Sequence, residues 1–338
     1  MNILIYGEPY EWAMAPNLKE ALEALGHRAE VYDWTRFLYR ARGLTWANRV
    51  RDRLLRCRTA GAINADFLHV LDRRKCDVLI VLKGCDLFPA TIVAAKKRVG
   101  RVVNWNPDDF FNPLNSTRHL VGSFDKFDCI FTPRGHLVEE YYRKGARRVE
   151  VIDWYYLPRF QRPVAVSPED VKSYGGSVAF VGSWSPRRER LLGALGHLDL
   201  RIWGGGWSKA AGWFRRTVSC RPPLFGERMA KVFCCTPINL NVLTRENRDT
   251  TNVRNFEIAA CAGFQLSERS APLLNLFAEN EEIACFDGAE ELASQCRYYL
   301  DHGQQRRRIA HAGYRRLKQG HHTMLDRAKQ ILDVLAGS

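Results

Sequence analysis

The chain has 338 residues, of which 46% are hydrophobic and 26% are charged. This composition excludes an intrinsically disordered protein, and the length is sufficient for two domains of ordinary size. Because no apolar run is long enough to span a membrane and the chain starts directly with a strand pattern, we expect a cytoplasmic protein without a secretion signal. The formal net charge of +14 predicts an anionic partner such as a nucleoside diphosphate, a nucleic acid or a membrane surface.

The first half of the sequence alternates short apolar runs with helical patterns. Residues 2–7 predict a buried strand, and residues 16–25 have their apolar side chains at helical spacing. Further strands are expected at five places: 29–34, 76–84, 101–109, 128–133 and 149–154. Strands separated by helices are typical of a parallel sheet, so this half is predicted to be Rossmann-like.

A stretch rich in proline and glycine, residues 158–176, predicts a linker. The alternation begins again after it, with a helix expected over 186–196 and a last helix over about 323–336. The strands expected in this half are 177–184, 199–206, 238–243, 264–268 and 282–286. The sequence therefore predicts two Rossmann-like α/β halves joined by a linker.

The segment 249–268 carries the clearest chemical pattern. Polar side chains crowd into its first turn and an apolar run follows, which indicates a buried helix with a polar start. A helix N-terminus suits a phosphate, and Arg254 adds a guanidinium that matches phosphate oxygens. Glu257 adds two acceptor oxygens for the hydroxyls of a ribose. We therefore predict a donor site for a nucleotide sugar, formed by Asp249, Thr251, Asn252, Arg254, Asn255 and Glu257.

This segment resembles the donor-site helix of glycosyltransferases with the GT-B fold. Asp249 and Glu257 have the spacing of the two acidic residues of the family 4 retaining enzymes, with Asp in place of the usual first Glu. The segment is also similar to the CgeB-type branch, which is spore-maturation-protein-like with a family 1/4-like C-terminal domain. The residues that follow its N-x-R-x-F-E-x-x-A-x-G pattern are Asn252, Arg254, Phe256, Glu257, Ala260 and, one place late, Gly263. The similarity covers about the last hundred residues well.

The resemblance implies a GT-B architecture of the α/β class, in which two Rossmann-like domains face a central cleft. It implies an N-terminal acceptor domain over 1–160 and a C-terminal donor domain over 161–322, with a helix in 323–338 that crosses back onto the first domain. The implied enzyme is a hexosyltransferase that moves a sugar from a nucleoside-diphosphate sugar to an acceptor hydroxyl. Its acceptor is expected to be a glycan, a lipid-linked molecule or a small molecule, as in polysaccharide or glycan biosynthesis.

Gly182 and Ser183 follow the strand that restarts the pattern, and Arg187 lies in the first turn of the next helix. Because a glycine lets a phosphate approach the backbone, we assign these three residues to the donor site. The alternative is an ordinary turn with a solvated arginine. Two neighbouring patterns also stay open: 203–207 either shapes a base pocket or bends the chain, and the asparagines of 239–241 either line the cleft or satisfy backbone groups.

Asp108 and Asp109 follow a predicted strand of the first half. Transfer to a hydroxyl requires a base that removes its proton, and a carboxylate at the end of a strand suits that task, so we predict catalysis by one of the pair. The alternative is a turn or helix-capping role, because Asn-Pro-Asp strongly favours a turn. His119 and His136 are rivals for the base, although a structural role explains each of them better.

Two further segments have both a functional and a structural interpretation. The loop after the first strand contains Glu8, Tyr10 and Trp12, which are expected to bind the acceptor or to form a plain surface loop. Residues 36–58 are dense in arginine with apolar residues between, as in helices that lie on an anionic membrane. For this segment we favour a surface helix that packs its apolar stripe on the domain core.

The resemblance implies that helix dipoles and arginines, and no metal, meet the charge of the leaving diphosphate, so no cofactor is expected. The ten cysteines form no Cys-x-x-Cys pair and predict reduced core thiols without a zinc site. Two other functions stay open: a nucleic-acid-binding protein that uses its basic surface, and a non-catalytic protein that binds a sugar nucleotide. The donor base and sugar, the stereochemical outcome and the oligomeric state stay open as well.

Overall fold

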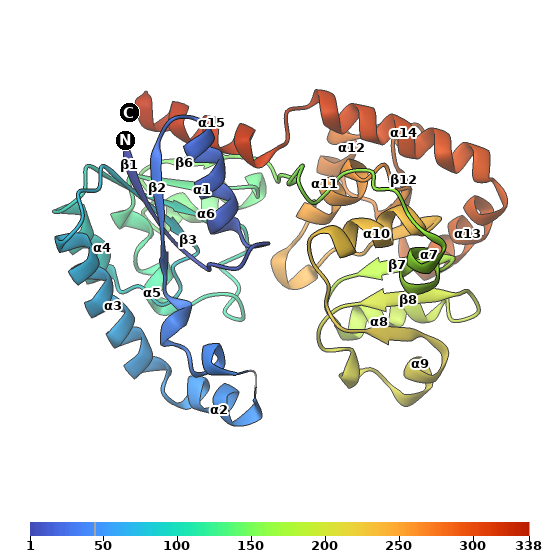
Figure 1. The fold of residues 1–338 in the computed structure, drawn as a ribbon, viewed down its shortest axis with the longest axis horizontal. Coiled ribbons are helices and arrows are strands. Elements are labelled where there is room, and N and C mark those ends of the chain that lie inside the picture. The colour runs from blue at the N-terminus through green and yellow to red at the C-terminus, as the bar shows by residue number, and fades with distance from the viewer. Residues whose placement is uncertain (44, 338) are drawn as a thin grey trace. The chain divides into compact units, whose positions relative to one another are not determined.

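The computed structural model describes residues 1–43 and 45–337, so Leu44 of the segment 36–58 and Ser338 of the segment 323–338 lie outside the described residues. The chain divides into two compact units. Unit 1 contains Met1–Asp153, Glu246–Arg248 and the C-terminal residues from Met324 on, and unit 2 contains Trp154–Arg245 and Asp249–Thr323. Each unit is built around a six-stranded sheet with helices on its faces (Figure 1).

The sheet of unit 1 is parallel throughout, with the strand order β2-β1-β3-β4-β5-β6. Its strands are β1 (Asn2–Gly7), β2 (Arg28–Asp33), β3 (Val78–Leu82), β4 (Arg101–Trp105), β5 (Cys129–Thr132) and β6 (Val149–Val151). All six lie within or next to segments that the sequence predicts as strands. The direction in which strands are added reverses between β1 and β3.

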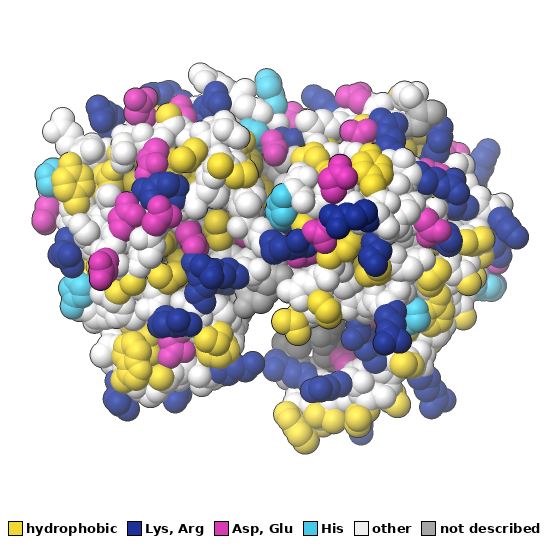
Figure 2. Space-filling model, turned by 180° about the vertical axis from the view of Figure 1, so that it is seen from behind, with side chains coloured by type: hydrophobic (Ala, Val, Ile, Leu, Met, Phe, Trp, Pro, Cys, Tyr) yellow, Lys and Arg dark blue, Asp and Glu magenta, His cyan; other side chains and the backbone are white. Residues whose placement is uncertain are grey.

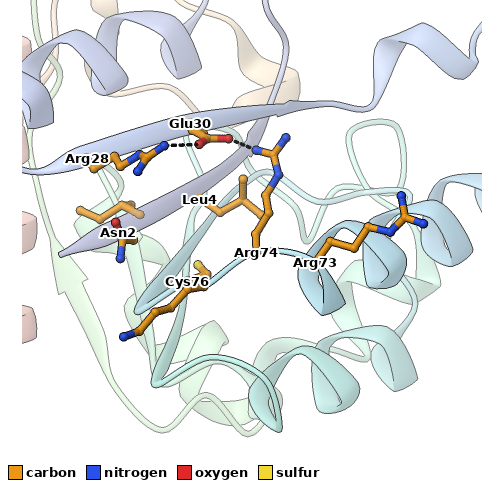
Figure 3. A pocket seen from close by; sticks show the side chains of 9 residues that line it. Asn2, Leu4, Arg28, Glu30, Arg73, Arg74 and Cys76 are labelled. Carbon is orange, nitrogen blue, oxygen red and sulfur yellow. Dashed lines mark ion pairs between the residues drawn. The ribbon is translucent and has the colours of Figure 1, made fainter.

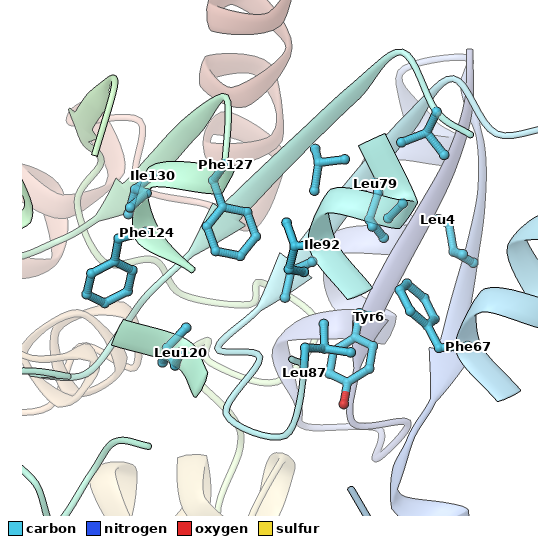
Figure 4. Packing of buried hydrophobic residues seen from close by; sticks show 14 of the residues in the cluster. Leu4, Tyr6, Phe67, Leu79, Leu87, Ile92, Leu120, Phe124, Phe127 and Ile130 are labelled. Carbon is cyan, nitrogen blue, oxygen red and sulfur yellow. The ribbon is translucent and has the colours of Figure 1, made fainter. Parts of the chain in front are cut away.

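Helices cover both faces of this sheet. The helices of unit 1 are α1 (Met14–Ala24), α2 (Trp46–Leu54), α3 (Arg56–Asp72), α4 (Pro89–Lys96), α5 (Arg118–Val121), α6 (Val138–Arg143) and α15 (Met324–Ala336), of which α2 buries none of its described residues. Alternate residues of the strands point to opposite faces. On one face Leu4 and Leu79 pack with Phe67 of α3 and Ile92 of α4 (Figure 4). On the other face α1 packs against α15, so the last helix of the chain completes the core of unit 1 (Figure 1).

The sheet of unit 2 is also parallel, with the order β12-β11-β10-β7-β8-β9. Its strands are β7 (Val178–Val181), β8 (Leu200–Trp203), β9 (Ser219–Arg221), β10 (Ile238–Asn241), β11 (Gln265–Glu268) and β12 (Ala284–Phe286). The sequence does not predict β9, because this edge strand has only three residues and none of them is buried. The reversal of strand order lies between β7 and β10.

The helices of unit 2 are α7 (Pro168–Tyr174), α8 (Pro186–Gly193), α9 (Gly212–Thr217), α10 (Glu227–Cys235), α11 (Val253–Ala260), α12 (Ala271–Leu276), α13 (Gly288–Asp301) and α14 (Gly303–Gln319). Phe180 of β7 packs in the cluster that includes α8 and α13, and Val181 packs in the cluster that includes α10 and α11. The predicted linker is wrong over α7. There Ser167 and Asp170 form a capping box, which starts a helix despite the surrounding prolines.

The favoured interpretation of the segment 36–58 is also wrong for α2. None of the described residues of this helix is buried, and Trp46 and Leu54 are 80% and 76% exposed. The following helix, α3, does send Ile63 and Phe67 into the core. Across the described residues, every helix falls short of the length and apolar character that crossing a bilayer requires.

Candidate donor and acceptor sites

The topology of each sheet marks one edge as the place for a ligand. In open parallel sheets, ligands bind beyond the carboxyl ends of the strands, where the strand order reverses. In unit 2 this position lies beyond the ends of β7 and β10. The first residue after β7 is Gly182, and the first residue after β10 is Val242. In unit 1 it lies beyond the ends of β1 and β3. The first residue after β1 is Glu8, and the first residue after β3 is Lys83.

Arg188 ties the two strand ends of unit 2 together. Its side chain donates to the carbonyl oxygen of Ser183 at 3.0 Å, to that of Val242 at 2.7 Å and to Oγ1 of Thr244 at 2.8 Å. The guanidinium also lies 5.3 Å from the ring centroid of Phe180. Because Arg188 is only 8% exposed, this buried charge has its partners within the fold. Nothing in the local sequence separates Arg188 from Arg187, and only the tertiary contacts show that Arg188 is held by the fold.

Arg187 points to the neighbouring strand end. Its Nη1 donates to Oε2 of Glu268 at 3.0 Å, and its Nη2 contacts the other carboxylate oxygen. Glu268 also accepts the backbone N–H of Leu243 at 3.1 Å. Arg187 is therefore held at the carboxyl edge of the sheet, and the alternative of a freely solvated arginine does not describe it.

The turn after β7 packs against the glycine-rich turn after β8. The N–H of Gly182 donates to the carbonyl of Trp203 at 2.9 Å, and its own carbonyl accepts from Nε1 of Trp207 at 2.9 Å. A Cβ on Gly204 would lie 1.9 Å from the oxygen of Gly182, so only glycine permits this approach. The glycine-rich segment 203–207 is thus explained by chain packing. Ser183 accepts from Arg188 through its backbone carbonyl oxygen and through its Oγ.

The polar helix start predicted within 249–268 is confirmed at α11. Oδ1 of Asn252 accepts the N–H of Arg254 at 3.1 Å, and Oδ1 of Asn255 accepts the N–H of Asn252 at 3.1 Å, which completes a capping box. The amide of Asn252 also pairs with that of Asn241 at 3.0 and 3.2 Å.

Asn255 has a structural explanation that the sequence did not reveal. This residue is fully buried, and its Nδ2 donates to Oε1 of Gln265 at 2.8 Å and to Oγ of Ser267 at 3.2 Å. Its amide therefore joins α11 to β11, and its assignment to the donor site has to be corrected. Asn239 is likewise buried and donates to backbone carbonyls at the end of α10, as the structural alternative predicts.

Arg254 and Glu257 form an ion pair on the surface of α11. Nη1 of Arg254 lies 2.5 Å from Oε2 of Glu257, and the guanidinium lies 5.5 Å from the ring centroid of Phe233. Their side chains are 19% and 12% exposed. Burial raises the pKa of Glu257 above its ordinary value, and the charge of Arg254 offsets only part of this effect. Glu257 therefore already contacts the guanidinium that a phosphate would use.

Asp249 and Thr251 lie in the loop between β10 and α11. Oδ2 of Asp249 accepts the N–H of Thr244 at 3.2 Å, which holds its carboxylate beside the end of β10. Thr251 is 9% exposed, and its carbonyl accepts from Nε1 of Trp154 at 3.2 Å. The side chain of Arg254 contacts Glu257 and Met229.

In unit 1, Asp109 is almost entirely buried and firmly paired. Nε and Nη2 of Arg248 donate to its two oxygens at 2.6 and 3.1 Å, and the N–H of Phe111 adds a third bond at 3.0 Å. Burial alone would raise the pKa of Asp109, but the bonds from Arg248 and Phe111 outweigh it and lower this pKa. A carboxylate with a lowered pKa is a poor proton acceptor, so Asp109 suits the structural alternative better than catalysis.

Asp108 is more accessible and pairs with a residue that the sequence did not single out. Its Oδ2 lies 2.8 Å from Nζ of Lys83, and its side chain is 26% exposed. Lys83 follows β3 with a φ of 61°, in the left-handed region that lysine seldom adopts. Partial removal of its half-exposed side chain from water would lower the pKa of Lys83, but the charges of Asp108 and Glu8 outweigh this and raise the pKa, so the ammonium stays charged. The feature of the sequence that could have identified Lys83 is its position directly after a buried strand.

Residues 246–248 belong to unit 1 although they lie between β10 and α11 in the sequence. The carbonyl of Asn247 accepts from Nη1 of the buried Arg134 at 2.8 Å, and its Nδ2 donates to Asp108 at 3.2 Å. Arg134 and Arg248 contribute with burial to lowering the pKa of His136. The sequence did not reveal this anchoring, because its partners are more than a hundred residues apart.

The predicted acceptor residues Glu8, Tyr10 and Trp12 are exposed in the loop between β1 and α1. The rings of Tyr10 and Trp12 stack with centroids 5.6 Å apart and an interplanar angle of 8°. They are 42% and 46% exposed, so this aromatic pair stands in solvent beyond the reversal of the sheet.

Within the described part of the chain, no group of three or more His, Cys, Asp or Glu side chains is placed to hold a metal ion. A depression of about 380 Å³ lies at the opposite edge of the sheet of unit 1, where β1 and β2 begin (Figure 3). Its Glu30 forms ion pairs with Arg28 and Arg74. Its charges are thus partly neutralised, and it lies away from the reversal of strand order.

Comparison with known proteins identifies the fold. Residues 187–333 match a family model described as glycosyl transferase-like. Among solved structures, sucrose-phosphate synthase from Thermosynechococcus elongatus has a TM-score of 0.70 at 12% identity, with 100% of both chains covered. HepE of Anabaena in complex with UDP-glucose has a TM-score of 0.69 at 12% identity, with the same coverage. No match was found among curated protein sequences.

A third similar structure is the α,α-trehalose 6-phosphate synthase of Burkholderia multivorans. Its TM-score is 0.66 at 11% identity, and 100% of this chain and 99% of that chain are covered. The predicted fold class is confirmed: the two parallel six-stranded sheets with their helices match glycosyltransferases of the GT-B fold.

The pairing of Asp109 predicts a pH-dependent loss of stability in Asp109→Asn. The free energy of unfolding of the variant should be about 2 kcal/mol lower than that of the wild type at neutral pH, because the variant loses charged hydrogen bonds in a buried position. Since the pKa of Asp109 is lowered on folding, its contribution is full above the ordinary value of 3.8 and is lost as the pH falls further. Urea unfolding at a series of pH values should show the two proteins converging in acid.

Asp125→Asn provides the control for this experiment, because Asp125 forms a partly exposed pair with Lys126. Its effect should stay within about 0.5 kcal/mol at every pH. A difference between wild type and Asp109→Asn that is independent of pH would contradict the assigned pairing.

The positive φ of Lys83 predicts that Lys83→Gly is more stable than Lys83→Ala by about 1 kcal/mol. Both variants lose the ion pair with Asp108, so their difference isolates the cost of the left-handed backbone. The comparison is made by chemical denaturation of the two variants. Equal stabilities would show that the turn after β3 is not strained.

Proposed function

We propose that this protein is a glycosyltransferase that moves a sugar from a nucleoside diphosphate to an acceptor hydroxyl. The observation that carries the proposal is the glycosyl transferase-like match over residues 187–333, which includes α11 with its capping box and the Arg254–Glu257 pair. The bound UDP-glucose of the similar Anabaena protein supports a sugar nucleotide as the donor. The proposal extends to transfer of a hexose in the cytoplasm and to the CgeB-type branch in glycan or polysaccharide synthesis.

Donor binding is assigned to unit 2. The leaving diphosphate gains negative charge, which the N-terminus of α11 and the guanidinium of Arg254 stabilise. Glu257 then exchanges its bond with Arg254 for bonds to the ribose hydroxyls. Arg187 at the end of the neighbouring strand supplies a second cation once Glu268 yields it. The proposed reaction uses these groups and no metal ion.

Acceptor activation is assigned to unit 1, with Asp108 as the base. Asp108 is the more exposed of the two predicted aspartates, and its partner Lys83 fixes the direction of its carboxylate. The stacked rings of Tyr10 and Trp12 provide an apolar platform for a sugar ring. Glu8 adds an acceptor for sugar hydroxyls at the same edge of the sheet.

The donor class is tested by a thermal-shift screen with UDP, GDP, TDP, CMP and ADP. A ligand that binds only the folded protein raises its melting temperature, so one diphosphate should stabilise the chain above the others. Absence of stabilisation by all five, together with no hydrolysis of any sugar nucleotide, would overturn the proposed function.

The donor assignment predicts different effects for the two members of the ion pair. Arg254→Ala should weaken binding of the stabilising diphosphate by about 2 kcal/mol, or roughly 30-fold, because a charged bond to phosphate is lost. Glu257→Ala should weaken the same nucleotide but not inorganic pyrophosphate, which has no ribose. Calorimetric titration of both variants with both ligands measures these changes.

Arg201→Ala is the matched control, because Arg201 pairs with Asp199 at the start of β8, on the opposite edge of the sheet. It should bind both ligands like the wild type. If Glu257→Ala strengthens binding of both ligands, Glu257 only occupies Arg254 and the ribose assignment fails.

The acceptor assignment predicts that Asp108→Ala lowers turnover about a hundredfold or more while donor affinity stays unchanged, because the variant lacks the base. Turnover is followed as release of the diphosphate in the presence of an acceptor. Asp109→Ala serves as the comparison, and it should lower the stability of the protein more than it lowers turnover. Full activity of Asp108→Ala would dismiss this residue as the base.

A further inference from the structure

Helix α2 presents an apolar stripe to solvent. Trp46, Val50 and Leu54 are spaced four residues apart and therefore share one face of the helix. Trp46 is 80% exposed and Leu54 is 76% exposed. An amphipathic helix of a globular domain normally buries such a stripe against the core, so the exposure of this one requires a partner.

Polar contacts on the opposite face fix the helix in this orientation. Nδ2 of Asn48 donates to the carbonyl of Gly43 at 2.9 Å, and Oδ1 of Asp52 accepts the N–H of Tyr39 at 2.6 Å. Thr45 caps the start of the helix by accepting the N–H of Asn48 at 3.2 Å. Asn48 and Asp52 are one turn apart, so they anchor the face that lies away from the apolar stripe.

Arginines border the stripe on both sides. At 100° per residue, Arg49 and Arg53 fall on one flank of the stripe and Arg51 on the other. Arg56 and Arg58 follow at the start of α3, and all five arginines are exposed. Seen from behind in Figure 2, unit 1 shows exposed hydrophobic side chains next to Lys and Arg side chains in the region of α2.

We propose that α2 is a docking surface for a lipid bilayer that contains anionic lipids. A tryptophan and a leucine in one stripe enter the boundary between headgroups and acyl chains, and the flanking arginines contact the lipid phosphates. A nucleic acid would use the arginines but would leave Leu54 exposed to water. The surface lies outside the residues assigned to sugar transfer, so it does not depend on the proposed function.

The test measures binding of the full chain to vesicles of phosphatidylcholine with and without phosphatidylglycerol, by co-sedimentation. The wild type should bind the anionic vesicles much more strongly than the neutral ones. Trp46→Ser/Leu54→Ser should lower the partition coefficient at least about tenfold, because two apolar side chains no longer enter the bilayer. Arg49→Gln/Arg53→Gln should lower it by about 25-fold at low salt, at about fivefold for each arginine.

Arg307→Gln/Arg308→Gln is the matched control, because it removes the same charge from two exposed positions on α14. It should bind vesicles nearly as well as the wild type. Thermal unfolding of each variant verifies that the fold is kept, which is expected because the four substituted side chains of α2 are not buried.

Three outcomes would overturn the proposal. Equal binding to neutral and anionic vesicles would remove the role of the arginines. Equal losses in the α2 arginine variant and in the α14 control would show that only the overall charge matters. Binding to a single-stranded polynucleotide that depends on Arg49 and Arg53 but not on Trp46 and Leu54, without binding to vesicles, would assign the surface to nucleic acid.

Discussion

The hydrogen bonds of the buried Arg188 guanidinium are the interaction on which the carboxyl edge of the sheet of unit 2 depends. It joins the end of β7, through Ser183, to the end of β10, through Val242 and Thr244. A charge removed from water must be matched by hydrogen bonds, so the two loops keep the positions that satisfy it. Because these strands flank the reversal of the sheet, the same network shapes the place where the topology puts a ligand.

Three other cations at the carboxyl ends of the strands each have an anionic partner within their own unit. Arg187 pairs with Glu268 and Arg254 with Glu257 in unit 2, while Lys83 pairs with Asp108 in unit 1. Partly buried charges without partners are costly, so internal pairs stabilise the protein in the absence of a ligand. Under the proposed function, an incoming diphosphate would meet cations whose charge these carboxylates balance in its absence.

The sequence predicts the strands well because a strand buried in a parallel sheet is a short continuous apolar run. It also predicts the start of α11, since Asn252 and Asn255 form a local capping box. The local sequence does not predict which distant residues the polar side chains bind. Nothing local shows that the amide of Asn255 binds Gln265, or that Asp109 binds Arg248 at a separation of 139 residues.

Sequence alone thus determined the two α/β halves, the positions of most strands and the chemical types present at the strand ends, because these follow from local periodicity and composition. Only the tertiary structure decided which polar side chains are consumed by the fold and which stay accessible. It separated Asp108 from Asp109, brought Lys83 to the edge of the sheet and left the stripe of α2 in solvent. Burial and pairing depend on contacts between distant residues, and no local pattern specifies them.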